Sequence, residues 1–122
     1  YMIRILSLLL ILFCTPLAAA PNGTIRVIDA DTIDVGGTRV RLYGIDAPEM
    51  DRAAGRRAAE HMRQLLWGAE ITCSIKGIDS YDRIVGQCFN AQGHDLACLM
   101  VQSGHAQDWP RFSGGYYRAC EP

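Results

Sequence analysis

The sequence lacks an excess of charge of either sign. Of its 122 residues, 12 are Lys or Arg and 13 are Asp or Glu, so the formal net charge is −1 and the isoelectric point is near 6.3. Domains that bind nucleic acid through bulk positive charge usually have an isoelectric point above ~9. The composition therefore argues against that class of protein, and any recognition of an anionic partner must be local.

Repeats, low-complexity stretches and long linkers are also missing after residue 20. The residues are 49% hydrophobic and 20% charged, a balance that excludes disordered and fibrous chains. No two cysteines have the C-x-x-C spacing, and His61, His94 and His105 are scattered, so a zinc site is not expected. We expect a single globular domain over residues 21–122.

The long apolar run of the sequence lies near its start. Met2-Ile3-Arg4 is short and basic, Ile5–Cys14 is almost wholly apolar, and the run leads into small residues ending at Ala20. A transmembrane helix needs roughly 18 apolar residues, and Pro16 interrupts this run too early. An amphipathic or buried helix is the alternative, but the run has no polar face. The pattern predicts a secretory signal peptide over residues 1–20, cleaved after Ala20.

Export changes the interpretation of the cysteines. Cleavage leaves Cys73, Cys88, Cys98 and Cys120, an even number in an oxidising compartment, which indicates two disulfides. Four cysteines allow three connectivities, and four buried free thiols are the alternative. A hairpin would bring Cys73 and Cys88 together, so we favour that pair, with Cys98 bonded to Cys120.

Alternating apolar residues predict strands over residues 24–28, 32–35 and 38–42. Gly36-Gly37 between the last two is typical of a tight hairpin turn. The period of two puts Val40 and Leu42 on one face and Arg41 on the other.

The second half of the chain alternates between expected helices and strands. Asp51 is expected to cap a helix that runs through Trp67 and stops at Gly68. Further strands are expected over residues 71–75 and 84–89, followed by a helix over residues 95–103. This order predicts a small, partly open β-barrel with helices packed on it.

Polar clusters interrupt this pattern at residues 29–32, 41–49 and 81–83. Each cluster alone is most simply a turn or a solvated surface. Together they place carboxylates and two arginines at strand ends. Carboxylate oxygens suit Ca²⁺ or Mg²⁺ and can activate water, and guanidinium groups match phosphate oxygens. The combination is suited to phosphodiester chemistry.

The order and spacing of these segments resemble the staphylococcal nuclease (thermonuclease) family. The segments are Val27-Ile28-Asp29-Ala30-Asp31-Thr32, Val40-Arg41-Leu42-Tyr43-Gly44-Ile45-Asp46-Ala47-Pro48-Glu49 and Asp79-Ser80-Tyr81-Asp82-Arg83. The similarity covers residues 24–104. It implies an OB-fold, a five-stranded barrel with two or three packed helices. The third helix of the family is expected to be largely missing, with a Cys98–Cys120 disulfide tying down the tail in its place.

The resemblance also implies a Ca²⁺ site. Asp31 and Asp46 would bind the ion through their carboxylates and Ala47 through its backbone carbonyl, with Asp29 lying behind them. Glu49 matches the carboxylate that acts as general base or orients the attacking water.

The remaining matches concern the substrate. Arg41 and Arg83 match two phosphate-binding arginines, and Tyr81 matches a tyrosine that lines the substrate groove. The family commonly has Gly where this chain has Asp82 and can have Lys at Ser80, so phosphate attraction beside Arg83 is expected to be weaker here.

We therefore expect an exported, monomeric, Ca²⁺-dependent nuclease that is secreted or periplasmic and has no stable membrane insertion after cleavage. The family resemblance implies hydrolysis of DNA and RNA to products with a 3′-phosphate. One alternative is a catalytically silent OB-type module that only binds nucleic acid. Another is a disulfide-bonded envelope protein with no nucleic-acid partner.

Overall fold

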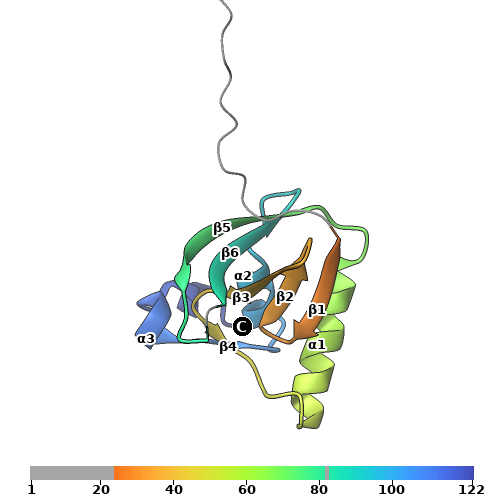
Figure 1. The fold of residues 1–122 in the computed structure, drawn as a ribbon. Helices are drawn as coiled ribbons and strands as arrows, with labels where there is room; N and C mark the ends of the chain where they lie inside the picture. The colour runs from red at the N-terminus through yellow and green to blue at the C-terminus, as the bar shows by residue number, and fades with distance from the viewer. Residues whose placement is uncertain (1–23, 82) are drawn as a thin grey trace, which may run out of the picture.

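The structure is a computed structural model that describes residues 24–81 and 83–122 (Figure 1). The predicted signal peptide and Asp82 lie outside these residues. Within the described ranges, no helix is long and apolar enough to cross a membrane.

A curved five-stranded sheet forms the centre of the molecule (Figure 1). Its strand order is β1-β2-β3-β6-β5, in which β3 and β6 run parallel and the other neighbours are antiparallel. The strands are β1 (Ile25–Asp29), β2 (Thr32–Val35), β3 (Thr38–Leu42), β5 (Ile71–Ile78) and β6 (Ile84–Asn90). The sheet does not close on itself, which confirms the predicted partly open barrel of the OB type.

The hairpin between β2 and β3 has the predicted turn. Gly36 and Gly37 have φ angles of 59° and 91°, values that favour glycine. The turn pairs Ile33 with Val40, and both side chains are fully buried. Alternation along β3 therefore leaves Arg41 on the opposite face, as predicted.

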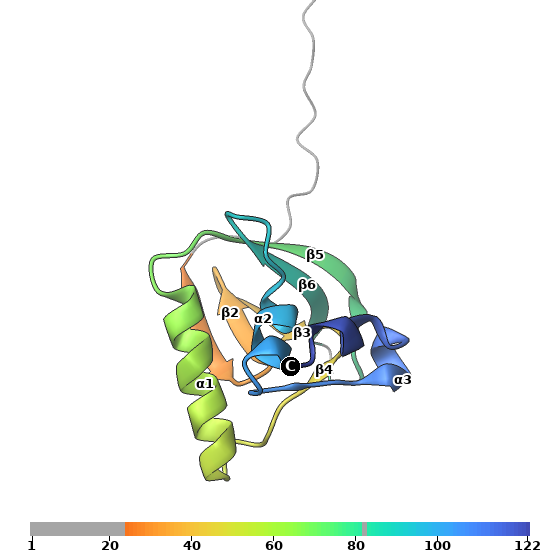
Figure 2. The same ribbon diagram turned by 180° about the vertical axis from the view of Figure 1, so that it is seen from behind.

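Helix α1 (Ala53–Leu66) packs beside β1 (Figure 2). Its buried residues include Ala58, Met62 and Leu66. The predicted Asp51 cap is wrong: the N-cap is Arg52, and no side chain caps the helix. The Arg52 amide donates to the Glu49 carbonyl, so Asp51 lies inside a tight turn instead of at the helix start.

The C-terminal part packs under the sheet as short elements. These are α2 (Leu96–Gln102), β7 (Gln107–Asp108), α3 (Pro110–Ser113) and the 3₁₀ helix η1 (Tyr116–Cys120). Strand β7 pairs with β4 (Ile45–Asp46), from the first half of the chain, in a separate two-stranded sheet. The helix predicted over residues 95–103 is α2, and Asp95 caps it by accepting a hydrogen bond of 2.9 Å from the Ala97 amide.

Both predicted disulfides are confirmed. Cys73–Cys88 joins paired positions of β5 and β6. Cys98–Cys120 links α2 to η1 across 22 residues. The second bond holds the C-terminal segment on the barrel, where Tyr117 is fully buried.

Candidate active site

Arg41 is the most tightly held charged side chain of the candidate site. Its guanidinium donates to the Leu42 carbonyl at 2.7 Å and to the Ile45 carbonyl at 2.9 Å. It also lies 3.4 Å from a carboxylate oxygen of Asp31. These contacts join the β1–β2 turn, β3 and β4 at one point. The side chain therefore has little freedom to move.

Asp29, the last residue of β1, and Asp31, in the turn before β2, form a close pair of carboxylates. Oδ1 of Asp29 is buried and has no hydrogen-bond partner among the described residues. Burial, followed by the negative charge of Asp31, raises the pKa of Asp29, and the Arg83 guanidinium partly offsets this increase. The two carboxylates thus have too little positive charge nearby to balance them.

Asp46, Ala47 and Glu49 lie on and just after β4. Ala47 is buried, whereas Asp46 and Glu49 are exposed. Neither exposed carboxylate makes a hydrogen bond or ion pair with a described residue. The Arg41 contact to the carbonyl of Ile45 anchors the strand that carries Asp46 beside the turn that carries Asp31.

The acidic side chains do not by themselves enclose a metal ion. Among residues 24–81 and 83–122, no group of three or more His, Cys, Asp or Glu residues could hold one. Two carboxylates and a backbone carbonyl supply only hard oxygen donors, and Ca²⁺ commonly completes such a set with water. The donor chemistry and the unpartnered Asp29 oxygen therefore fit Ca²⁺.

Arg83 is held by its own loop. Its Nε donates to Asp79 Oδ2 at 2.7 Å, while Asp79 Oδ1 accepts from the backbone amides of Tyr81 and Arg83, both at 2.9 Å. Burial alone would raise the pKa of Asp79, but these amide hydrogen bonds and the guanidinium outweigh it and hold the pKa below its ordinary value. The sequence assigned no role to Asp79, although it begins the segment that contains Arg83. The structure shows that its carboxylate positions Arg83.

Both arginines line one cleft of about 340 Å³. Arg41 is paired with Val85 of β6, and Arg83 immediately precedes that strand, so the parallel β3–β6 pairing brings them to the same cleft. We call this cleft the groove. Tyr81 also lines it, and its ring lies 5.4 Å from the Arg83 guanidinium.

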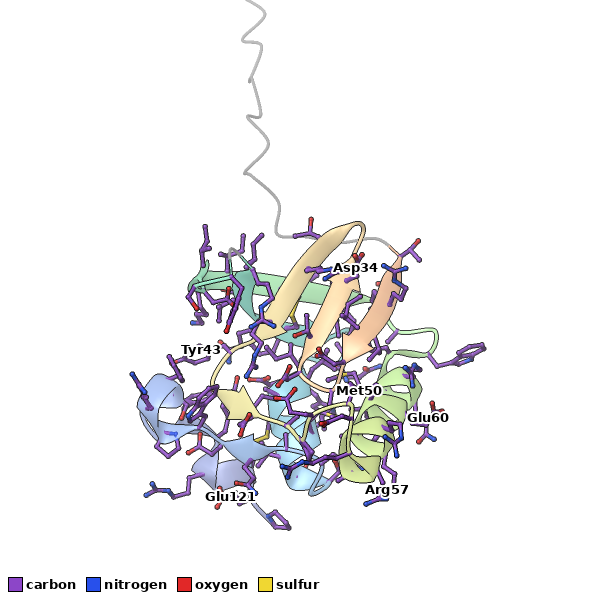
Figure 3. All side chains as sticks on the ribbon, turned by 60° about the horizontal axis from the view of Figure 1, so that its bottom comes forward. Asp34, Tyr43, Met50, Arg57, Glu60 and Glu121 are labelled. Atoms are coloured by element: carbon purple, nitrogen blue, oxygen red, sulfur yellow. A yellow bond between two sulfur atoms is a disulfide. The ribbon has the colours of Figure 1, made fainter. Side chains whose placement is uncertain are left out.

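Sequence reasoning missed the aromatic wall of the groove. Tyr43, Trp109 and Phe112 line it, and the Trp109 ring lies 5.8 Å from the Arg41 guanidinium. The spacing of three between Trp109 and Phe112 was the available signal, because it puts both rings on one face of a helical turn. In Figure 3 the labelled Tyr43 lies on the side of the molecule away from α1.

Comparison with known proteins gives consistent matches. The sequence profile described as "Staphylococcal nuclease homologue" matches residues 39–116, which include each proposed site residue except Asp29 and Asp31. A "Succinoglycan biosynthesis protein ExoI" of Rhizobium meliloti (strain 1021) is 34% identical in an alignment of 110 residues that covers 81% of this chain and 58% of that protein. This chain thus spans little more than half of that relative.

Two further relatives have nuclease names. An "Uncharacterized endonuclease" of Escherichia coli is 32% identical over 116 residues, covering 90% of this chain and 76% of its own length. A "Micrococcal nuclease" of Shigella flexneri is 35% identical over 94 residues, covering 67% of this chain and 54% of its own.

Proposed function

The chain belongs to the staphylococcal nuclease family of phosphodiester hydrolases, and from that premise we propose that it is an exported, Ca²⁺-dependent nuclease. Its substrates are DNA and RNA, and its products carry a 3′-phosphate. One observation carries the proposal: two immobilised arginines share a groove beside a pair of carboxylates that lacks sufficient positive charge.

The two arginines bind the scissile phosphate. Planar guanidinium groups match phosphate oxygens and stabilise the negative charge that grows in the transition state. Arg41 and Arg83 are already held by carbonyl and carboxylate partners. Little reorganisation is therefore needed when the substrate arrives.

Asp31, Asp46 and the backbone carbonyl of Ala47 are the proposed Ca²⁺ ligands, with Asp29 adding negative charge behind Asp31. An ion held by these residues would supply positive charge to polarise the phosphate. Glu49 orients a water molecule and accepts its proton as the water attacks phosphorus in line. The P–O5′ bond breaks with its electron pair passing to the 5′-oxygen, which takes a proton from solvent and leaves as a hydroxyl group. The exposed position of Glu49 leaves its carboxylate accessible to water.

Export is proposed from the signal peptide expected over residues 1–20. Two disulfides in a small domain are consistent with an oxidising compartment, secreted or periplasmic. We propose a monomer that begins at Pro21 after cleavage. Intact mass and native mass spectrometry of the exported protein test these two points, and a retained leader or a stable dimer would contradict them.

Cleavage of single-stranded DNA with Ca²⁺, with and without a chelator, tests the central proposal. We expect Ca²⁺-dependent products with 3′-phosphate ends, because the oxygen donor set requires the ion for turnover. Asp46→Ala should weaken Ca²⁺ binding and abolish cleavage, whereas Glu121→Ala, an exposed carboxylate elsewhere, serves as the control. Binding of DNA without cleavage at any Ca²⁺ concentration would instead identify a catalytically silent module.

A further inference from the structure

A second hollow, of about 470 Å³, lies between β1 and the C-terminal end of α1. Its lining includes Arg26 of β1, Arg63 of α1 and Trp67, and it shares no lining residue with the groove. Figures 1 and 2 show α1 and α3 on opposite sides of the molecule. The hollow therefore lies well apart from the aromatic wall that α3 contributes to the groove.

Trp67 is the C-cap of α1 and is 89% exposed. Its indole thus contributes almost no buried area to the described fold. An exposed indole beside a hollow offers a free aromatic face, and nucleic-acid bases stack on such faces whatever their sequence.

Helix α1, which leads to Trp67, is basic although the whole chain is not; at the hollow itself, Arg26 and Arg63 have Asp34, Glu60 and Glu70 as neighbours. Between residues 52 and 67 the sequence has four arginines and a single acidic residue, Glu60. Figure 3 shows Arg57 and Glu60 pointing outward from α1. The surplus of positive charge along α1 is a local feature by which a protein of net charge −1 can attract a polyanion.

The two arginines of the hollow are weakly engaged. The exposed Arg26 lies 3.8 Å from the mostly buried carboxylate of Asp34, at the outer limit of an ion pair. Arg63 lies 3.1 Å from Glu60 in a solvent-exposed pair of the kind that contributes little to stability. Glu70, just after the lining residues, adds one exposed negative charge. Both guanidiniums can therefore exchange their carboxylate partners for phosphates.

We propose that this hollow is a second binding site, an exosite, for single-stranded nucleic acid. A base stacks on Trp67 while Arg26 and Arg63 bind neighbouring phosphates. The inference rests on the proposed function. If the exosite binds, the preferred substrate is a strand long enough to occupy the groove and the exosite together.

Tryptophan fluorescence tests the exosite without any cleavage. The chain has two tryptophans, so Trp109→Phe leaves Trp67 as the single reporter. We expect a strand of roughly 30 nucleotides, longer than the roughly 4–16 that one OB fold covers, to quench Trp67 in the presence of chelator. Arg63→Ala should weaken this binding and lower its salt dependence by about one phosphate contact. A saturating strand that leaves Trp67 fluorescence unchanged would overturn the proposal.

Kinetics give a second, independent readout. Trp67→Ala should raise KM for the long strand about fivefold, the lower range for loss of one stacked base, and leave cleavage of a dinucleotide unchanged. Arg118→Ala, an exposed arginine of η1, is the matched control and should alter neither substrate. An equal effect on both substrates, or on neither, would overturn the exosite.

The two proposals fail in distinguishable ways. If the wild type cleaves neither substrate, the nuclease proposal fails, and quenching of Trp67 still decides whether the exosite binds. Thermal unfolding of Trp67→Ala should match the wild type because the indole is exposed. If it does not, charge reversal by Arg26→Glu replaces it as the kinetic test, with the same expected loss on the long strand alone.

Discussion

The arginines of the groove are partly buried and held in place, whereas those of the hollow are exposed and loosely paired. The side chains of Arg41 and Arg83 are 12% and 31% exposed, and both are held by hydrogen bonds. Those of Arg26 and Arg63 are 71% and 48% exposed, and each has one loose or solvated partner. The first pair is organised in advance for chemistry, and the second is free to adapt to a polymer.

The difference has a physical cause. A partly buried guanidinium must have its charge and its donors satisfied, so carbonyls and carboxylates hold it in one orientation. That fixed orientation is useful at a transition state, where reorganisation would slow the reaction. An exposed guanidinium is hydrated and mobile, so it can follow a flexible backbone of phosphates.

The largest contrast between the two regions should come from Glu49→Gln. The amide keeps the size of the side chain but cannot accept a proton, so kcat should fall roughly 10²–10⁴-fold while nucleotide binding survives. Glu60→Gln, on the α1 face, is the matched control and should leave kcat unchanged. Steady-state kinetics and a binding isotherm for each variant check this, and equal effects of the two substitutions would contradict the role of Glu49.

Arg41→Lys tests the rigidity of the groove. A lysine retains the charge but loses the planar fork that contacts two carbonyls and Asp31, so kcat should fall about 10²–10³-fold with a smaller change in KM. Arg63→Lys keeps the charge of the exposed region and should leave dinucleotide cleavage unchanged. Loss of binding alone in Arg41→Lys, with kcat intact, would show that Arg41 only captures substrate.

Removing the Cys98–Cys120 disulfide should loosen one region and spare the other. The double variant Cys98→Ala, Cys120→Ala should lose about 3 kcal/mol of unfolding free energy, as expected for a loop of this length. The loop includes Trp109 and Phe112, so KM at the groove should rise, while quenching of Trp67 by a long strand should persist. Denaturant unfolding and the fluorescence assay check both parts, and loss of Trp67 quenching would show that the regions are coupled.

Asp79→Asn should have the smallest effect. It removes the charged partner of Arg83 but keeps an acceptor, so kcat/KM should fall about tenfold, less than for loss of the arginine itself. In the wild type the folded pKa of Asp79 lies below the ordinary 3.8. Its stabilising contribution is thus present above that ordinary value and is lost as pH falls through the lowered pKa. NMR titration of the Asp79 carboxyl measures this directly, and an unshifted pKa would remove the basis for the prediction.

Local rules predicted most of the fold. Alternation predicted the β2–β3 hairpin, and apolar spacing predicted the helix that is observed as α2. The capping prediction at Asp51 was wrong, because the Arg52–Glu49 backbone hydrogen bond shifts the helix start by one residue. A cap depends on the path of the preceding loop, which composition does not reveal.

By itself, the sequence determined the strand and helix order from periodicity, indicated two disulfides from the cysteine count and favoured their pairing from the expected hairpin. The family resemblance then implied which two arginines to look for. Tertiary structure alone decided how each arginine is held and which aromatic rings form the groove wall. Arg41 meets the Asp31 carboxylate and the Ile45 carbonyl from separate segments, and Trp109 reaches the same cleft from far along the chain. Contacts between distant segments depend on packing in three dimensions, so no local pattern in the sequence records them.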